Sequence, residues 1–472
     1  MATAYDEVLY PGFAFARTHP DQLAVMATLF GLNPAPPERC RFLEIGCADG
    51  GNLIPMACDL PESSFFGVDL AQTMVEQGQR QIAELSLANI RLAQMDLMEM
   101  SAEAGTFDYI VAHGLYSWVP EPVRDKLMSL VRDLLAPQGV AYVSYNTLPG
   151  CRIREAIREM LLFHLRDTAG SKERIEKARE FLEALAQTGV DNPFDREARA
   201  MLDKPPQVLF HDELGEVYHP VYVREFTTHA GRFGLRFLCE ASYGEMQTPE
   251  VVRHFAGSDR LNMELYGDFL RGRFFRRTLL CKAEAESSPE LIEGRIPQLY
   301  AASPADEVSP GKFAGPRGGA VEAVHPLSRA VLGALIRVWP ETLSFSELLE
   351  AVGGPPDPAS VATILHGTFS SGLVNLHARR PRCVRTPGEF PRTTALVRWQ
   401  AQRGDSVTTP MNGTVKFEGE TERYFVTLLD GTRDVPMLAS QFAPAFPGTR
   451  EELEREIRVN LDRLARMCVL VR

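Results

Sequence analysis

A glycine-rich turn between a short apolar run and a helical run is the feature best suited to chemistry. It reads Phe42-Leu-Glu-Ile-Gly46-Cys-Ala-Asp-Gly50-Gly-Asn52, with Glu44 two residues before the first glycine. Glycines let the backbone approach a ligand where a side chain would clash. Glu44 can neutralise an ammonium group directly or through water. The pattern predicts a site for the amino-acid end of S-adenosylmethionine (SAM); a purely structural strand–helix turn is the alternative.

Two further acidic residues follow the next two apolar runs. Asp69 ends Phe66-Gly-Val-Asp69, where a carboxylate can accept both ribose hydroxyls of a nucleoside. Asp96, in Gln94-Met-Asp96-Leu97, can accept from an adenine amino group, with Leu97 on the ring. One such Asp is often only a helix N-cap, but three acids behind one glycine-rich turn favour a single adenosyl ligand. The predicted cofactor residues of this region are Glu44, Gly46, Cys47, Ala48, Gly50, Asn52, Asp69, Leu70, Asp96 and Leu97.

The fourth apolar run leads into Ala112-His113-Gly114-Leu-Tyr116-Ser-Trp118-Val-Pro120. Ligands of open α/β sheets bind at the carboxyl ends of the strands, so His113 and Gly114 should line the methionine arm. Tyr116 and Trp118 then offer an aromatic wall near the methyl group. Methyl transfer needs mainly alignment and desolvation, and a π-face favours a methylated cation. The alternative is that Trp118 packs on the helix expected from Val123.

Other acceptor chemistries lack their motifs. The fifth strand ends in Ser144-Tyr145-Asn146-Thr-Leu-Pro149-Gly150, and the chain has no (Asn/Asp)-Pro-Pro-(Tyr/Phe) tetrad, which argues against adenine or glutamine methylation. His211 and His219 lack ligand spacing, so we predict no metal site.

Alternating strands and helices must position these residues. Strands are expected at 41–45, 65–69, 90–93, 107–112 and 140–145, with helices at 52–60, 72–85 and 123–135. Such alternation implies a parallel sheet covered on both faces. Strand-like runs at 235–241 and 275–282 should close its far edge, the last one antiparallel. The expected fold is α/β, a Rossmann-like seven-stranded class I methyltransferase sheet with helical insertions at about 151–230 and 244–272.

Four parts of the chain are expected: an N-terminal segment that covers the cofactor (1–30), the methyltransferase domain (31–285), a linker (286–320) and a mostly α, winged-helix-like C-terminal domain (321–472). The stretch 303–320 has the Pro/Gly-rich composition of a linker. Helices are expected at 327–338, 345–351, 359–369 and 450–466. Strands are expected at 373–377 and 468–471, with a hairpin in 418–434 around Asp430-Gly431.

Bulk composition narrows the classes of partner. The formal charge of the 472 residues is −12, which argues against a phosphate-backbone partner. A local basic patch is expected from Arg271, Arg273, Arg276, Arg277 and Lys282, but the helix at 359–369 has no Arg or Lys to read a groove. Eight scattered cysteines, the absence of a signal peptide and the absence of a long apolar run predict a reduced cytoplasmic protein without membrane insertion.

Several strings together resemble one family. They are Tyr5-Asp-Glu with Thr18-His19-Pro-Asp21, the glycine-rich turn, His113-Gly-Leu-Tyr116-Ser-Trp118-Val-Pro120, the segment Ala141 to Gly150, and Asp268 to Leu280. The sequence is similar there to bacterial methyltransferases that carry a methyltransferase regulatory domain. The best-understood members of that family methylate lysines of outer-membrane proteins. The likeness covers residues 1–285 well and the remainder only in general layout.

The resemblance implies that the N-terminal segment folds over SAM, with Tyr5, Thr18 and His19 near the cofactor. It also implies an acceptor pocket shaped by Tyr116, Trp118, Tyr145 and Asn146, a protein substrate such as an outer-membrane protein before export, and S-adenosylhomocysteine as product. Ala48 and Cys151 depart from the family pattern and leave the lysine acceptor open. The alternatives are a small-molecule methyltransferase with the C-terminal half as a lid, and a non-catalytic SAM-binding protein. A homodimer is left open.

Overall fold

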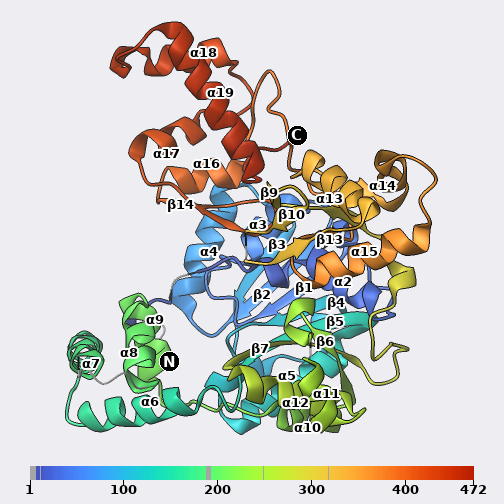
Figure 1. Ribbon diagram of the computed structural model, residues 1–472. Helices are drawn as coiled ribbons and strands as arrows, with labels where there is room; N and C mark the ends of the chain where they lie inside the picture. Colours follow the sequence, from blue (N-terminus) through green and yellow to red (C-terminus); the bar gives the residue numbers. More distant parts are fainter. Residues whose placement is uncertain (1–6, 11, 188–192, 248, 317) are drawn as a thin grey trace.

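The computed structural model describes residues 7–10, 12–187, 193–247, 249–316 and 318–472, and a seven-stranded sheet forms its centre (Figure 1). The strand order is β3-β2-β1-β4-β5-β7-β6. Strands β1 to β5 pair in parallel, whereas β7 is antiparallel to both β5 and β6. This arrangement is the predicted Rossmann-like sheet with one antiparallel strand near its far edge. The bounds are β1 Arg41–Ile45, β2 Ser64–Asp69, β3 Ile90–Gln94, β4 Phe107–Ala112, β5 Leu135–Asn146, β6 Leu235–Glu240 and β7 Phe275–Lys282.

Alternate residues of the strands enter two separate cores. Phe42 of β1 packs with α2 (Pro20–Leu29) and α3 (Leu53–Asp59), while the next residue, Leu43, packs with α5 (Glu121–Leu134) and α10 (Val223–Arg232). Successive side chains of a strand point to opposite faces, so the continuous apolar runs indicate a sheet covered on both sides. Helix α4 (Gln72–Glu84) also packs on β2 and β3.

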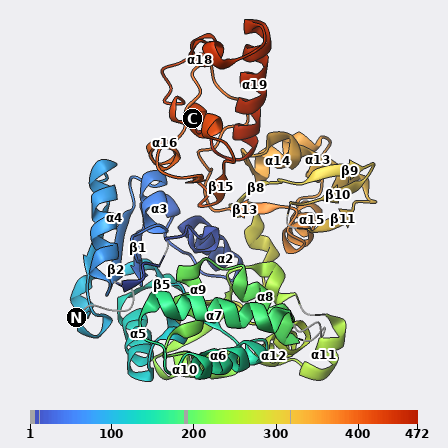
Figure 2. The same ribbon diagram turned by 90° about the vertical axis from the view of Figure 1, so that its left-hand side faces the viewer.

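Both predicted insertions are helical. The first contains α6 Arg152–His164, α7 Ser171–Ala186, α8 Pro193–Leu202 and α9 Pro206–Leu214 before α10. Helices α6 to α9 share a small core of their own and project from one side of the sheet (Figures 1 and 2). The second insertion contains α11 Glu250–Ala256 and α12 Arg260–Arg271, and it leads directly into β7.

The first part of the C-terminal half is a small α/β unit. Its three expected helices are confirmed as α13 Pro326–Val338, α14 Phe345–Val352 and α15 Pro358–Ser370, beside a sheet of β12 Leu343–Ser344, β8 Tyr300–Ala302 and β13 Asn375–His377. The winged-helix likeness stays a prediction, as do the domain boundaries. The stretch 303–320 is not a plain linker, because it forms β9 Asp306–Ser309, β10 Lys312–Ala314 and the start of β11 Ala320–Glu322 around a buried Phe313. Its glycines lie in the turns that connect these strands, Gly311 between β9 and β10 and Gly315 between β10 and β11.

The last part is helical, with one short hairpin. Its elements are α16 Ala395–Ala401, β14 Ser406–Thr408, β15 Thr414–Lys416, α17 Glu420–Thr427, α18 Val435–Phe442 and α19 Arg450–Arg466. The hairpin expected in 418–434 is wrong, because about half of that segment is the helix α17 and no strand pairs within it. The true hairpin lies earlier in the chain, around Asn412-Gly413. Asp430 instead lies within the loop between α17 and α18, where its side chain accepts a hydrogen bond from the backbone N–H of Thr432.

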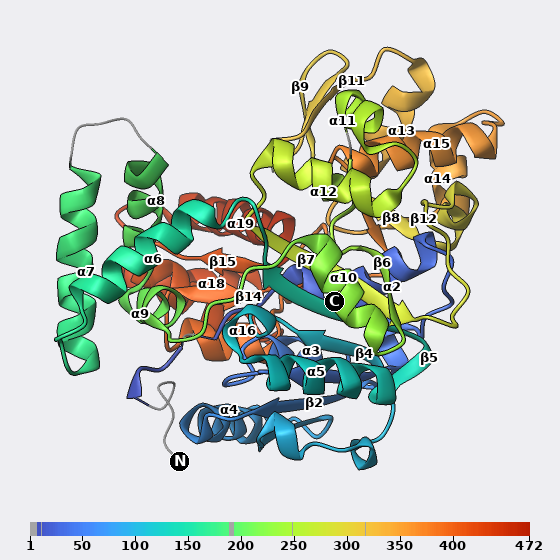
Figure 3. The same cartoon turned by 90° about the horizontal axis from the view of Figure 1, so that it is seen from below.

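Buried polar contacts attach the C-terminal half to the sheet domain. Asp21 of α2 accepts hydrogen bonds from the backbone N–H of Ala378 and Arg379, at 2.7 and 3.2 Å, and from His377 Nδ1 at 2.7 Å. Burial opposes the charge of Asp21, but His377 and Arg379 hold the pKa of its carboxyl well below the usual value. Helix α16 of the C-terminal half also lies against α3 of the sheet domain (Figure 3). Throughout the described residues, we find no helix with the length and apolar character needed to cross a membrane.

Candidate functional site

The glycine-rich turn leaves β1 with three residues in the left-handed conformation. Gly46 and Gly50 have φ of 78° and 77°, and Ala48 between them has φ of 49°. Left-handed backbone is open to glycine and costs other residues roughly 1–2 kcal/mol, which explains why the commonest pattern has glycine at the position of Ala48. The N–H groups of Gly46 and Cys47 both reach the carbonyl of Val68, which ties the turn to the end of β2.

Asp69 braces the turn. Its Oδ2 accepts from the backbone N–H of Ala48 at 2.8 Å, and its Oδ1 accepts from that of Ala71 at 2.9 Å. Asp69 pairs with Gln94 of β3 in the sheet register, and the N–H of Met95 donates to its carbonyl. Asp96 therefore stands beside Asp69 at the same edge of the sheet, where it also caps the turn at Leu97 by accepting from Met98 N–H.

Glu44 is buried with half of its carboxylate unused. Its Oε1 accepts from Asn52 Nδ2 at 2.7 Å, while Oε2 has no hydrogen-bond partner among the described residues. Burial, followed by the charges of Asp69 and Asp49, raises the pKa of Glu44 to about 8. A buried acceptor without a donor is destabilising by roughly 1–3 kcal/mol. The side chain is therefore suited to a cationic donor such as an ammonium group, which is the donor that SAM carries at its amino-acid end.

The affinity for SAM should consequently depend on the protonation of Glu44. Below a pKa of about 8, binding of an ammonium to the carboxylate must displace a proton, so affinity should rise about tenfold from pH 6 to pH 7. Calorimetric titration at the two pH values measures this change. The Glu44→Gln variant should bind weakly and show no such slope; an equal slope in the variant would assign the titration to another group.

The N-terminal segment lies over this edge of the sheet. Phe15 packs its ring on that of His113, with centroids 3.9 Å apart, and its N–H donates to Asn52 Oδ1 at 2.9 Å. Thr18 Oγ1 accepts from Asn52 Nδ2 at 2.9 Å. His19 is different, because it caps α2 and faces Asp59, 3.7 Å away. Tyr5 lies outside the described residues. The role of Phe15 is not predictable from the sequence, because nothing local distinguishes this residue from the neighbouring aromatic residues.

His113 and Gly114 follow β4 at the same edge. His113 Nδ1 lies 2.9 Å from the hydroxyl of Tyr142. Burial, together with the charge of Arg277, lowers the pKa of His113 to about 3, so its ring is neutral at physiological pH. The N–H of Gly114 donates to Ser144 Oγ at 2.8 Å, and its φ of 66° again requires left-handed backbone.

The four expected acceptor residues separate into two places. Tyr116 and Tyr145 are buried against Phe226 of α10, with ring centroids 5.0 and 4.0 Å from it. The hydroxyl of Tyr116 lies 2.8 Å from His229 Nδ1, and His229 Nε2 lies 2.8 Å from Asp125. Burial raises the pKa of Tyr116 to about 12. Both tyrosines are therefore part of a packed wall.

Trp118 and Asn146 are in a different setting. Trp118 is half-buried, and its ring centroid is 5.1 Å from that of Tyr218. The guanidinium of Arg158 lies 4.5 Å from the Tyr218 ring and 5.7 Å from the Trp118 ring. The N–H of Asn146 donates to Ser117 Oγ, while its side-chain Nδ2 is buried without a partner among the described residues. Trp118 therefore packs on Tyr218 and beside the arginines of α6.

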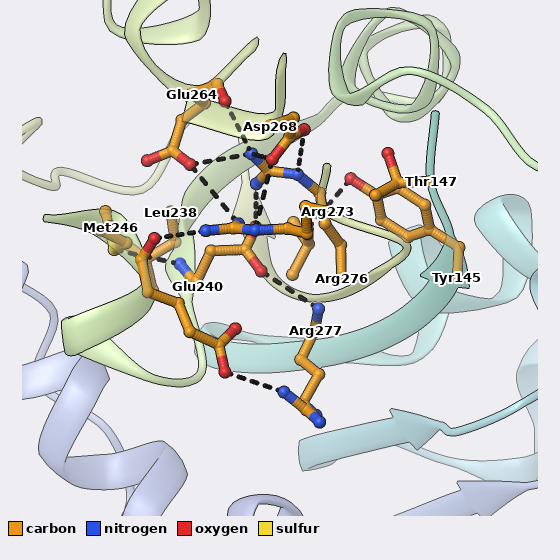
Figure 4. Close-up of polar contacts among 12 residues, drawn as sticks. Tyr145, Thr147, Leu238, Glu240, Met246, Glu264, Asp268, Arg273, Arg276 and Arg277 are labelled. Carbon is orange, nitrogen blue, oxygen red and sulfur yellow. Dashed lines mark hydrogen bonds and ion pairs between the residues drawn. The ribbon is translucent and has the colours of Figure 1, made fainter. Parts of the chain in front are cut away.

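A buried ion cluster supports this wall from β7 (Figure 4). Arg276 is 0% exposed and donates to Asp268, Glu240 and Glu264, at 2.8, 2.6 and 2.9 Å. Thr278 Oγ1 lies 2.8 Å from Glu240 and 3.2 Å from the hydroxyl of Tyr145, so it links the cluster to the wall.

The expected basic patch is wrong for Arg273, Arg276 and Arg277, because acidic partners neutralise them. Within the described residues, no group of three or more His, Cys, Asp and Glu could hold a metal.

Comparison with known proteins agrees with this geometry. Residues 42–139 match the family model described as "Methyltransferase domain", and residues 205–282 match "Predicted methyltransferase regulatory domain". The uncharacterized protein RP028 of Rickettsia prowazekii is 36% identical over 241 residues, which are 50% of this chain and 96% of the relative. RP789 of the same organism is 36% identical over 288 residues, or 59% of this chain. The match spans only about half of RP789, 52% of its length.

The solved structure of PKMT2 from Rickettsia typhi is similar over nearly the whole chain. Its TM-score is 0.85 at 25% identity, covering 98% of this chain and 100% of that one. A second structure of PKMT2, in complex with AdoHcy, matches with the same TM-score at 24% identity, covering 98% of this chain and 100% of that one, which shows the shared fold. The glycine-rich turn, the unused carboxylate oxygen of Glu44 and these matches lead to one conclusion. The chain belongs to the SAM-dependent class I methyltransferases that carry a methyltransferase regulatory domain.

Proposed function

We propose that this enzyme transfers the methyl group of SAM to a lysine side chain of a protein substrate. The His113-Gly-Leu-Tyr116-Ser-Trp118-Val-Pro120 string carries the proposal. It resembles that of the family whose best-understood members methylate lysines, and it follows β4 at the edge where the glycine-rich turn ends β1. The structural likeness to PKMT2 extends through the C-terminal half. This supports the proposal that the two proteins use the same parts of the chain for the same kind of reaction.

Each cofactor residue is assigned to a part of SAM by its position and by the hydrogen-bonding atoms that it can offer. Glu44 offers Oε2 to the ammonium of SAM. Asp69 already braces the turn, and carboxylate oxygens have further lone pairs, which it offers to the ribose. Asp96 and Leu97 border the adenine. The methionine arm is surrounded by residues of the turn and of two neighbouring segments: Gly46, Cys47, Ala48, Gly50, Asn52, Thr18, His113 and Gly114. Leu70, which follows β2 and is 48% exposed, is assigned to the rim of the site. His19 has a supporting role, through α2.

On the acceptor side, Tyr116 and Tyr145 form the back of the site and Trp118 and Asn146 its front. A lysine amine must be neutral to attack, and its usual pKa of about 10.4 falls when the ammonium is desolvated. The ring of Trp118, which Arg158 approaches less closely than it does Tyr218, offers a π-face that favours the methylated cation that forms. His113 stays neutral beside the reacting groups, and a neutral imidazole does not repel the sulfonium of SAM. These residues align and desolvate the acceptor, which is most of what methyl transfer requires.

A labelling experiment tests the acceptor. The enzyme and tritium-methyl SAM are incubated with a whole bacterial lysate that includes its outer-membrane proteins, and the products are separated into protein, nucleic-acid and small-molecule fractions. We expect label in protein that survives mild base and appears as methyl-lysine after acid hydrolysis. The Asp69→Ala variant is the control for background transfer. Label released by base as an ester, label on another amino acid, or label confined to small molecules would each overturn the proposal.

A further inference from the structure

The hairpin of β14 and β15 carries the C-terminal half to the cofactor edge of the sheet. Its loop, residues 409–413, places Asn412 against Asn52 of the glycine-rich turn. Asn412 Nδ2 donates to Asn52 Oδ1 at 2.9 Å and lies 3.5 Å from the carbonyl of Phe15. Asn412 is 2% exposed, although it is 360 residues from Asn52 in the sequence. Figure 1 shows β14 between the red C-terminal helices and the blue helix α4.

The loop is built to hold this side chain in place. Thr409 N–H donates to the carbonyl of Gly413 at 2.8 Å, and Asn412 N–H donates to that of Thr409 at 2.9 Å. Asn412 has a φ of 57°, in the left-handed region, where asparagine and glycine are the residues most readily accommodated. The backbone thus fixes the direction of the amide independently of any ligand.

Hydrogen-bond logic fixes the orientation of both amides. The backbone N–H of Phe15 can only donate, so the Asn52 atom that it meets must be Oδ1. Asn412 must then present Nδ2 to the same oxygen, which leaves its own Oδ1 as a free acceptor. This Oδ1 is buried and has no partner among the described residues. Asn52 therefore holds Glu44 at its Nδ2 and Asn412 at its Oδ1, and each of these neighbours keeps one unused buried acceptor.

We propose that Asn412 is a cofactor-binding residue contributed by the C-terminal half, and that its Oδ1 accepts a hydrogen bond from the α-ammonium of SAM beside Glu44. An ammonium has three donors, so one group satisfies both unused acceptors. The inference rests on the cofactor placement proposed above and not on the nature of the methyl acceptor. It also gives the C-terminal half a role in the reaction, since SAM then binds fully only when the hairpin is docked.

The Asn412→Gly variant tests the contact because glycine keeps the left-handed backbone and removes only the amide. Calorimetry should show about tenfold weaker SAM binding, the loss expected for one hydrogen bond to a charged group. Binding of 5′-methylthioadenosine, which lacks the amino-acid part of SAM, should be unchanged. A matched control is Glu84→Gln, which removes another contact of the C-terminal half, to Trp399 and Arg403, without touching the site; it should bind both ligands normally.

A second measurement needs no variant. In the native enzyme, SAM should slow amide hydrogen exchange in residues 409–413, whereas 5′-methylthioadenosine should leave that exchange unchanged. Unchanged SAM affinity in Asn412→Gly, equal losses for both ligands, or equal protection of the loop by both would overturn the proposal. None of these readouts involves a methyl acceptor, so they can fail or succeed independently of the lysine assignment.

Discussion

The Asp69→Ala variant is expected to bind SAM at least a hundredfold more weakly than the native enzyme. The substitution removes the acceptor of the Ala48 N–H, which braces the glycine-rich turn, and that of the Ala71 N–H. It also removes the proposed acceptor of the ribose hydroxyls. Hydrogen bonds to charged groups contribute about 1.5–3 kcal/mol each, and the loss of two corresponds to a factor of a hundred or more. Calorimetric titration with SAM measures the effect.

Asp96→Ala is the matched control for Asp69→Ala. Asp96 follows the neighbouring strand and caps a short turn through Met98 N–H, but it does not support the glycine-rich turn. Its replacement should weaken SAM binding by only about tenfold, the value for a single hydrogen bond to an adenine amino group. Equal losses in the two variants would show that Asp69 has no special role in the turn, and unchanged affinity in Asp69→Ala would place the ribose elsewhere.

The Arg276→Met variant is expected to lose about 3–5 kcal/mol in its free energy of unfolding. Methionine fills similar volume but leaves Glu240 buried without its ion-pair partner, and Glu264 and Asp268 with Arg273 alone. Breaking a buried pair on one side has an effect of this size. The carboxyls of the variant should have raised pKa values in the folded state. Its deficit should therefore be largest near pH 8 and should shrink towards pH 5, where these carboxyls take up protons.

Chemical denaturation followed by circular dichroism at the two pH values measures the deficit. Arg277→Met is the matched control, because Arg277 is one residue away and its ion pair with Glu245 is about one-third exposed on both sides. Exposed pairs contribute at most about 1 kcal/mol. If Arg276→Met loses no more stability than Arg277→Met, or if its deficit grows as the pH falls, the cluster does not hold β7 and α12 together as described.

Local patterns in the sequence were sufficient to predict the strands of the central sheet. The runs 41–45, 65–69, 90–93, 107–112 and 140–145 appear in β1 to β5, with only the start of β5 clearly earlier, at Leu135. These runs are short and apolar, and each has a Gly, Asn or Asp at or within two residues of one end, so each carries its own signal. The cofactor edge was predictable for the same reason. Once the strands are parallel and adjacent, the residues that follow them must lie at one edge.

Tertiary structure decided the features that depend on distant pairings. The Asn412-Gly413 pair is a turn signal between two short runs that alternate in polarity. Each run has only three residues, too few to outweigh the similar signal of Asp430-Gly431. The burial of Arg276 could not be predicted either, because its three acidic partners come from β6 and α12. The sequence of an alternating or charged segment does not indicate whether its polar side chains will be bound by water or by other side chains.

The sequence by itself therefore determined the SAM turn, the sheet and the family, because each depends on residues within a few positions of one another. Only the folded chain decided that Thr18, Glu44, Asn52 and Asn412 meet. It also decided that Tyr116 and Tyr145 form a packed wall while Trp118 lies beside Tyr218. The physical reason is that contacts between distant segments are set by how the two cores pack, and that packing is a property of the whole chain.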